Sequence, residues 1–267
     1  MNGWEALLLG LLQGLTEYLP ISSSGHLIIG KVCFGIETQG AAFEVMVHTA
    51  TVFSTITVFR KEIGRLLSGL FKLRYNNDTR YILQLLLSMV PILVVGLFFK
   101  SQVEELFGNG LTLVGSMLLV TAILLLVTQR LTVKETSKAP ELTYKDAFIM
   151  GLSQAIAVLP GLSRSGVTIS TGLLLGKERA AVAKFSFMMV LVPILGEVFL
   201  DIVRGGFAVQ VTGIPVWSLL IGFVAAYFSG LAACSVMLNL VKKAKLWGFA
   251  LYCTIVGAFC LLFHFLT

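Results

Sequence analysis

The stretch "GLTEYLPISSSGHLIIG", residues 14–30, places a carboxylate, three consecutive serines and a histidine between apolar flanks. The chain around it is 57% hydrophobic and only 13% charged, whereas soluble domains average about 25% charged residues. This composition predicts an integral membrane protein. An ionisable group at membrane depth is costly in free energy and by default marks a functional site. The candidate residues of this stretch are Glu17, Ser22, Ser23, Ser24 and His26.

Six apolar runs approach or exceed the length of about 20 residues that a transmembrane helix needs. They cover residues 42–59, 81–99, 111–128, 185–203, 215–240 and 246–266. Two shorter apolar stretches, 4–19 and 147–160, end at a proline and run into turns rich in Ser and Gly, and short helices are expected to follow at 26–35 and 167–176. A short helix, a polar break and a return helix are typical of a re-entrant hairpin. The expected fold is an all-α polytopic membrane protein with six transmembrane helices and two re-entrant hairpins, at 4–35 and 147–176.

Most of the 20 Lys and Arg residues concentrate in four segments, 60–80, 129–146, 177–184 and 241–245. Basic segments beside membrane spans lie on the cytoplasmic side, and with that assignment all spans alternate and both termini face outward. The net charge of +6 therefore reports topology, and nucleic-acid binding is not needed to explain it. No cleavable signal peptide is expected, because the first apolar stretch lacks a basic start. The four cysteines lie in apolar stretches without metal-ligand spacing and are interpreted as buried thiols.

The two hairpins resemble each other after a shift of 141 residues. This shift aligns Gly10 with Gly151, Gln13 with Gln154, Ser22 with Ser163, Ser24 with Ser165 and Gly25 with Gly166. The chain then divides into two repeats, 1–128 and 147–267, each with one hairpin and three spans, joined by a connector at 129–146. An odd number of spans gives the repeats opposite topology, so that the first hairpin enters from outside and the second from the cytoplasm. Inverted repeats place their sites near the midplane, and the two hairpin turns should therefore meet.

The second turn, "PGLSRSGVT" at 160–168, carries an arginine among hydroxyl side chains. An intramembrane arginine needs an anionic partner, and the planar guanidinium of Arg164 suits a phosphate. Hydroxyl groups and helix N-terminal N–H groups add donors, and glycines let the backbone approach a ligand. The residues concerned are Gly161, Ser163, Ser165, Gly166 and Thr168. The alternative interpretation is that Arg164 pairs with Glu17 and holds the repeats together, which would not exclude phosphate binding.

The first turn offers groups that a phosphate binder lacks. Gln13 and Glu17 are four residues apart and share a helix face. Glu17 has three candidate roles: a base, an orienting partner of His26, or a ligand of a divalent cation. One of the serines is a candidate nucleophile, and His26 is a candidate base or a nucleophile itself. The alternative is structural: the serines satisfy helix ends, Ser22 above all as an N-cap, and His26 is a capped loop histidine.

Other polar pairs in the spans are weaker candidates. Glu44 and His48 share a face at the outer end of the first span, and Glu197 and Asp201 do so near the outer end of the fourth. Either pair is interpreted as lying at the headgroup region or as lining an outward-facing funnel. A further small-residue face, formed by Gly10 and Gly14, predicts close helix packing rather than a site.

The quoted motifs resemble a known family, the undecaprenyl-diphosphate phosphatases, also called bacitracin-resistance proteins. "QGLTEYLPISSSGH" at 13–26 is similar to the first signature of that family, and "PGLSRSGVT" is similar to the second. The resemblance extends over essentially the whole chain, including its length and its repeat. Gln13 stands where many members have Glu, which suggests that Glu17 is the indispensable carboxylate.

The resemblance implies a hydrolase of the bacterial plasma (inner) membrane that removes one phosphate from undecaprenyl diphosphate and recycles the lipid carrier for cell-wall synthesis. It also implies dependence on a divalent cation, Mg²⁺ or Ca²⁺, for which Glu17 is the candidate ligand, and an active site reached from the outer side. The implied partners are a polyprenyl diphosphate and membrane lipids, and the sequence leaves open whether the chain forms a homodimer. The implied catalytic residues are Glu17, Ser22, Ser23, His26, Ser163 and Arg164. Those implied or expected to bind substrate are Gln13, Ser24, Gly25, Gly161, Ser165, Gly166 and Thr168.

Two other functions share some of these features. The type-2 phosphatidic acid phosphatases also use Ser-Gly-His and Ser-Arg elements, but they need a histidine six residues after the arginine, and position 170 is a serine. Inverted repeats with midplane hairpins are also transporter architecture, so a translocase of an anionic lipid or ion is the alternative to a hydrolase. Phosphate release by purified protein in detergent distinguishes the two, because no transbilayer gradient exists there.

Overall fold

The computed structural model describes residues 1–36, 42–72, 74–107, 110–132, 140–203, 213–243 and 245–266, and these residues form helices without any strand. The helices of the first half are α1 (Gly3–Thr16), α2 (Ser23–Phe34), α3 (Ala42–Val58), α4 (Arg60–Leu70), α5 (Asn77–Phe98), α6 (Lys100–Phe107) and α7 (Gly110–Leu131). Those of the second half are α8 (Tyr144–Ile156), α9 (Arg164–Leu174), α10 (Arg179–Met188), α11 (Leu191–Val203), α13 (Val216–Lys243) and α14 (Trp247–Leu266).

Both expected hairpins are present as helix-loop-helix units, but their second helices begin three residues earlier than predicted. The first hairpin is α1, the first loop (17–22) and α2; the second is α8, the second loop (157–163) and α9. Ser22 accepts a hydrogen bond from the Gly25 N–H, and Ser163 accepts one from the Gly166 N–H. A serine N-cap starts a helix at the next residue, so part of each polar motif lies on the first turn of a helix.

Four segments are long and apolar enough to cross a membrane, namely 77–98, 110–131, 179–200 and 216–241. A fifth counts if α3 and α4, which meet at an angle of 75°, are taken as one span, and α14 is a shorter apolar helix over Trp247–Phe263. Each of the six predicted spans thus coincides with apolar helix. The predicted span 185–203 is interrupted after Met188, because Pro193 lacks an N–H and clashes with the carbonyl four residues earlier, at Met189. The chain is therefore a multi-pass membrane protein.

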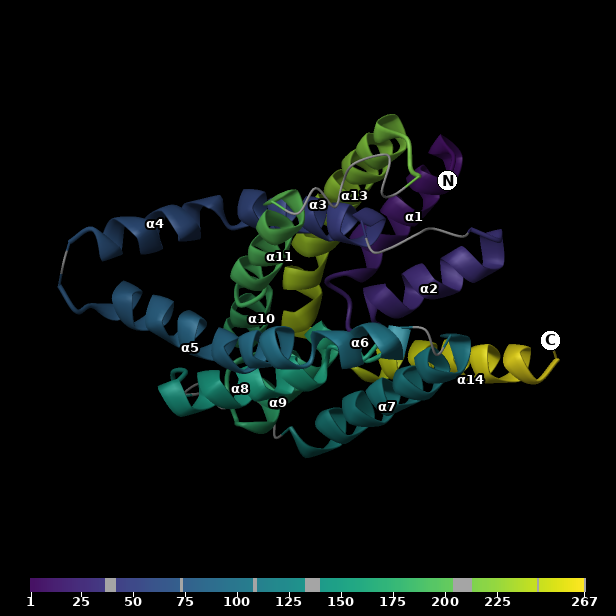
Figure 1. Ribbon diagram of the computed structural model, residues 1–267. Helices are drawn as coiled ribbons and strands as arrows, with labels where there is room; N and C mark the ends of the chain where they lie inside the picture. Colours follow the sequence, from purple (N-terminus) through teal and green to yellow (C-terminus); the bar gives the residue numbers. More distant parts are fainter. Residues whose placement is uncertain are drawn as a thin grey trace.

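Helices from the two halves of the chain pack against each other (Figure 1). The α1 helix packs against α13, α8 packs against α5, and α7 lies beside α14. The predicted small-residue face of α1 is confirmed. A Cβ at Gly10 would run into the Gly222 carbonyl oxygen, and one at Gly14 would run into the Ser229 hydroxyl group. Because glycine has no side chain, the backbones of α1 and α13 come into contact at these positions. This contact anchors the first hairpin against a helix of the second half.

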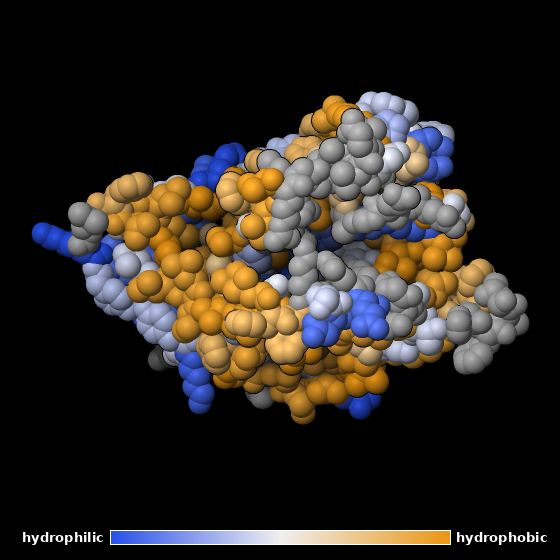
Figure 2. Space-filling view, viewed as in Figure 1, coloured by the Kyte–Doolittle hydropathy of each residue, from blue (hydrophilic) through white to orange (hydrophobic). Residues whose placement is uncertain are grey.

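The outer surface of the molecule is largely apolar, as Figure 2 shows for one face. Large exposed hydrophobic side chains recur on the long helices, among them Leu97, Ile123, Phe228 and Phe259. Such a surface is unfavourable in water and matches lipid. The expectation of four buried thiols is wrong for Cys33, which is exposed at the end of α2, because this short helix has its last turn at the surface; the other three cysteines are buried.

Candidate functional site

Glu17 lies at the end of α1, where its backbone N–H donates to the Gln13 carbonyl oxygen over 3.0 Å. Only 6% of this residue is exposed. Its carboxylate accepts hydrogen bonds from the Ser23 hydroxyl over 2.6 Å and from the Gln13 amide over 2.8 Å. Arg164 donates to the other carboxylate oxygen and forms an ion pair with it. A buried carboxylate is thus surrounded by donors from both hairpins.

Arg164 is the first residue of α9, and its side chain is 21% exposed. It reaches Glu17 from the second hairpin, as the sequence predicted when it placed the two turns against each other. Because a guanidinium has five donors in a fixed fork, the bond to one carboxylate oxygen leaves further N–H groups for an anion. The ion pair therefore joins the hairpins and keeps a positive group at their junction.

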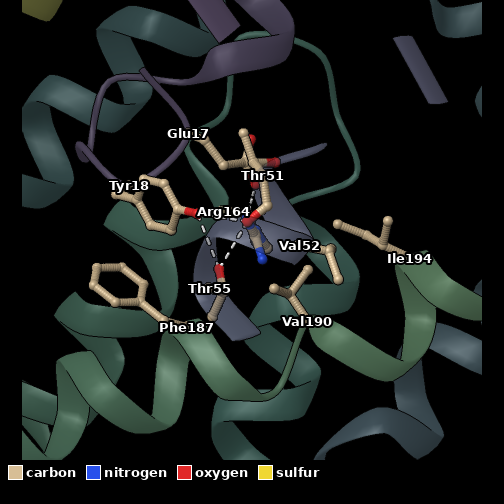
Figure 3. Close-up of a pocket in the computed structure, with 9 residues that line it drawn as sticks. All are labelled: Glu17, Tyr18, Thr51, Val52, Thr55, Arg164, Phe187, Val190 and Ile194. Atoms are coloured by element: carbon tan, nitrogen blue, oxygen red, sulfur yellow. Dashed lines mark hydrogen bonds and ion pairs between the residues drawn. The ribbon is translucent and has the colours of Figure 1, made fainter. Parts of the chain in front are cut away.

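A small pocket lies beside this ion pair (Figure 3). Its wall is formed by Glu17, Tyr18, Thr51, Val52, Thr55, Arg164, Phe187, Val190 and Ile194. The Tyr18 hydroxyl donates to the Thr51 carbonyl oxygen over 2.6 Å and lies 3.0 Å from the Thr55 hydroxyl, which fixes the first loop to α3. The cavity holds about 10 Å³, which is room for about one water molecule. A phosphate group does not fit this cavity as it stands.

The serines of the two turns have different partners, and the structural interpretation of Ser22 as an N-cap is confirmed. Ser22 and Ser163 cap α2 and α9, with oxygen-to-nitrogen distances of 3.3 and 3.1 Å. Their hydroxyls also lie 3.4 Å from Ser24 and 3.3 Å from Ser165, respectively. The same hydrogen bonds thus occur in both hairpins at positions 141 residues apart. Ser23 differs from these four serines, because its hydroxyl donates to Glu17.

The remaining residues of the second motif hold the hairpins in place. Ser165 donates to the Leu19 carbonyl oxygen of the first loop over 3.0 Å. Thr168 donates back to the Arg164 carbonyl oxygen over 2.8 Å and lies 2.6 Å from the Ser186 hydroxyl of α10. Both side chains therefore support the position of α9.

The glycines of the two motifs allow the turns to approach each other. A Cβ at Gly25 would lie 3.0 Å from the Gly161 Cα, which is closer than side chains normally pack. Gly161 also has a φ of 91°, a backbone conformation that favours glycine. A Cβ at Gly166 would lie 3.0 Å from the Ser163 Cβ and 3.4 Å from that of Pro20. These positions bring the first turn of α2 against the second loop.

His26 faces away from this cluster. Its Nδ1 lies 2.8 Å from the Ser22 carbonyl oxygen and its Nε2 lies 2.7 Å from the Tyr252 hydroxyl of α14. Both ring nitrogens are therefore engaged, and no contact found among the described residues joins this ring to Glu17 or Arg164. The structure thus brings together Gln13, Glu17, Ser23 and Arg164, and leaves His26 on a separate network.

Sequence reasoning gave too little weight to α3. His48 Nε2 lies 3.6 Å from a carboxylate oxygen of Glu17, and its Nδ1 lies 2.8 Å from the Glu44 carbonyl oxygen. The sequence offered a signal, because a histidine within an apolar span is unusual. Tyr252 carried no signal, since aromatic residues are common at membrane interfaces. The side chains of Glu197 and Asp201 lie outside the described part of the chain.

Several oxygen atoms around Glu17 are of the kind that coordinates a divalent cation. The Gln13 Oε1 atom is buried without a hydrogen-bond partner, and Glu17 and Ser23 add oxygens of the kind that Mg²⁺ and Ca²⁺ prefer. Among the described residues, however, no group of three His, Cys, Asp or Glu side chains gathers at one point. The residues therefore fit a cation whose remaining ligands come from substrate and water, as is usual for Mg²⁺.

Comparisons with known proteins cover nearly the whole chain. A family model described as "Bacitracin resistance protein BacA" matches residues 6–259. A curated "Undecaprenyl-diphosphatase" of Bacteroides fragilis is 54% identical over 96% of both chains. A protein of the same name from Parabacteroides distasonis is 54% identical over 96% of both chains. One from Methanobrevibacter smithii is 36% identical over 95% of this chain and 94% of the relative. This chain therefore belongs to the bacitracin resistance protein BacA family.

Proposed function

We propose that this protein is a membrane phosphatase that hydrolyses undecaprenyl diphosphate to undecaprenyl phosphate and inorganic phosphate. The observation that carries the proposal is the buried cluster in which Ser23 and Arg164 both donate to Glu17. It combines a nucleophile, a base and a fixed positive charge. The names of the curated relatives support the same substrate. The product is the monophosphate carrier, which is recycled for cell-wall synthesis.

Binding begins with an exchange of anions at Arg164. The diphosphate headgroup takes over the guanidinium, since a planar fork of donors matches phosphate oxygens. Glu17 then loses its cationic partner but keeps the Ser23 hydroxyl, which lies 2.6 Å away. Substrate binding therefore prepares Glu17 to accept the Ser23 proton.

The chemical step follows from this arrangement. Ser23 Oγ attacks the terminal phosphorus while its proton passes to Glu17, and the bond from that phosphorus to the bridging oxygen breaks. Undecaprenyl phosphate leaves, and water then cleaves the phosphoserine to release inorganic phosphate and restore Ser23. Arg164 stabilises the charge that develops on the phosphoryl oxygens. Ser23 is favoured over His26 as the nucleophile, because both His26 nitrogens are engaged elsewhere.

A divalent cation is part of the proposal. Glu17 and the unpartnered Gln13 Oε1 atom would hold it. When bound, such a cation supplies neutralisation of the diphosphate charge.

The proposed architecture has six spans and two re-entrant hairpins in inverted repeats, with both termini and the opening of the site on the outer side of the plasma membrane. The distribution of basic segments supports this orientation. A reciprocal contact supports the repeat: a Cβ at Gly115 in α7 would lie 2.8 Å from the Gly257 carbonyl oxygen in α14, and one at Gly257 would lie 2.8 Å from the Gly115 oxygen. A mutual contact of this kind is expected near a pseudo-twofold axis.

The test is phosphate release from undecaprenyl diphosphate by purified protein in detergent with Mg²⁺. The parent protein is expected to release phosphate, and Glu17→Gln is expected to lose the activity. Arg65→Ala, which removes an exposed ion-paired arginine of α4, serves as the control and should keep it. Absence of phosphate release by the parent, together with uptake of the lipid in proteoliposomes, would instead establish the translocase.

A further inference from the structure

A second polar contact links the first hairpin to the last helix. The Tyr252 hydroxyl of α14 lies 2.7 Å from His26 Nε2, and the two residues are 226 positions apart in the chain. Their rings are almost parallel, with an interplanar angle of 10° and centroids 5.5 Å apart. His26 is 5% exposed, so this hydroxyl completes the hydrogen bonding of a buried imidazole.

The partners of His26 determine its tautomer. The Ser22 carbonyl oxygen, 2.8 Å from Nδ1, can only accept, so Nδ1 carries a proton. In the neutral ring Nε2 is then an acceptor, and the Tyr252 hydroxyl donates to it. Hydrogen bonds at both nitrogens fix the orientation of the ring as well as its tautomer.

The turn that His26 holds is strained. Ser22 has a φ of 70° and is the one described non-glycine residue with a positive φ. Its carbonyl oxygen accepts from the His26 ring over 2.8 Å and lies 3.2 Å from the His26 backbone nitrogen. Unusual backbone conformations persist only where surrounding contacts enforce them. The next residue is Ser23, whose hydroxyl lies 2.6 Å from Glu17. A series of contacts thus runs from Tyr252 through His26 and Ser22 to the proposed nucleophile.

The hydroxyl of Tyr252 is not explained by burial. Tyr252 is 42% exposed and forms part of the wall of an open groove of about 460 Å³, together with Leu19, Ile21, Lys245, Gly248 and Phe249. A phenylalanine would present the same ring to this groove and to His26. Among the described residues, His26 is the hydrogen-bond partner found for this hydroxyl. The hydroxyl group, by which tyrosine differs from phenylalanine, therefore serves the contact with His26.

We propose that Tyr252 is a positioning residue for the phosphatase reaction: its hydroxyl fixes His26, and His26 enforces the strained Ser22 turn that sets Ser23 against Glu17. Tyr252 itself does not touch the reacting atoms. The inference rests on the proposed function as far as turnover is concerned, but the state of the His26 ring is open to measurement without any turnover.

The kinetic test is Tyr252→Phe, compared with Tyr227→Phe. Tyr227 is a matched control, because its hydroxyl lies 3.1 Å from the Thr57 hydroxyl and joins α13 to α3. Tyr252→Phe is expected to lower kcat about ten-fold, as for loss of one hydrogen bond, with KM changed by less than about two-fold. Tyr227→Phe should keep the parent kcat. A parent-like kcat in Tyr252→Phe, or an equal loss in both variants, would overturn the proposal.

The spectroscopic test uses protein with ¹⁵N-labelled histidine. The parent should give one histidine with a protonated Nδ1 and a hydrogen-bonded Nε2, assigned to His26 by its absence in His26→Gln. In Tyr252→Phe the Nε2 resonance of this histidine should shift, whereas in Tyr227→Phe it should stay in place. An unchanged resonance in Tyr252→Phe refutes the inference. If the parent releases no phosphate and the Nε2 resonance still shifts in Tyr252→Phe, only the proposed function is refuted.

Discussion

Arg164 and Glu17, which are 147 residues apart in the chain, form an ion pair where the two hairpins meet. The pocket beside them holds about 10 Å³, too little for a phosphate group. In the proposed mechanism, an anionic headgroup opens the site by replacing Glu17 at the guanidinium. Arg164 would then first hold the two hairpins together and afterwards bind phosphate.

Arg164→Lys tests whether the shape of the guanidinium matters beyond its charge. Lysine keeps the charge but offers no planar fork, so phosphate release should fall by about 10²–10³-fold, the usual effect of losing a donor to a developing oxyanion. Arg65→Lys, at an exposed ion pair of α4, is the control and should retain activity. Full activity of Arg164→Lys would mean that Arg164 serves only as a point charge.

Glu17→Gln tests the pair as a structural contact. Removing one partner leaves the other charge uncompensated, and for buried pairs this destabilises by about 3–5 kcal/mol. A value toward the lower end is expected here, because Arg164 is 21% exposed. Denaturant unfolding in detergent should show that the double variant Glu17→Gln/Arg164→Gln is less destabilised than the sum of the two single variants. Additive losses would indicate that the two side chains do not interact.

The serines should separate by role. Ser23→Ala removes the hydroxyl that contacts Glu17, so phosphate release should be lost. Because this hydroxyl donates to a buried carboxylate, the unfolding free energy should also fall by about 1.5–3 kcal/mol. Ser163→Ala removes the N-cap of α9 and should lower the unfolding free energy by about 0.5–2 kcal/mol. Phosphate release and denaturant unfolding, measured on the same preparations of each variant, test both expectations. An active Ser23→Ala variant would exclude Ser23 as the nucleophile.

Asp146 is expected to make an acid-sensitive contribution to stability at the start of α8. Burial alone would raise the pKa of its carboxyl, but hydrogen bonds from Lys177, over 2.8 Å, and from Thr143, over 2.6 Å, outweigh burial and hold the pKa below its ordinary value. Because the folded-state pKa is the lower one, the stabilisation is complete above the unfolded value of about 3.9 and is lost as the pH falls through the folded-state pKa. Asp146→Asn should therefore destabilise at pH 7 and make less difference in acid. An equal difference at both pH values would contradict this.

Topology is testable with cysteines. In a Cys33→Ser background, which removes the exposed native thiol, Gln102→Cys on α6 and Lys72→Cys after α4 place thiols at exposed positions. The proposed orientation expects a membrane-impermeant maleimide to label position 102 in intact cells and position 72 only after permeabilisation. The reverse pattern would place the opening of the site on the cytoplasmic side.

Several features of the fold followed directly from the sequence. Apolar run length predicted where the long helices lie, because a helix in lipid must satisfy its own backbone hydrogen bonds. The shift of 141 residues predicted that the two turns meet, and Arg164 is paired with Glu17. Helix starts were misplaced, because the capping bonds of Ser22 and Ser163 depend on local geometry that hydropathy does not report.

The membrane class, the location of the helices and the two polar turns were predictable from the sequence, since composition and spacing are local properties of the chain. Which polar groups meet depends on how the helices pack. Side-chain direction depends on how helices are rotated against each other, so sequence alone did not separate Ser23, which faces Glu17, from His26, which faces Tyr252. For the same reason His48 of α3 came to lie 3.6 Å from Glu17.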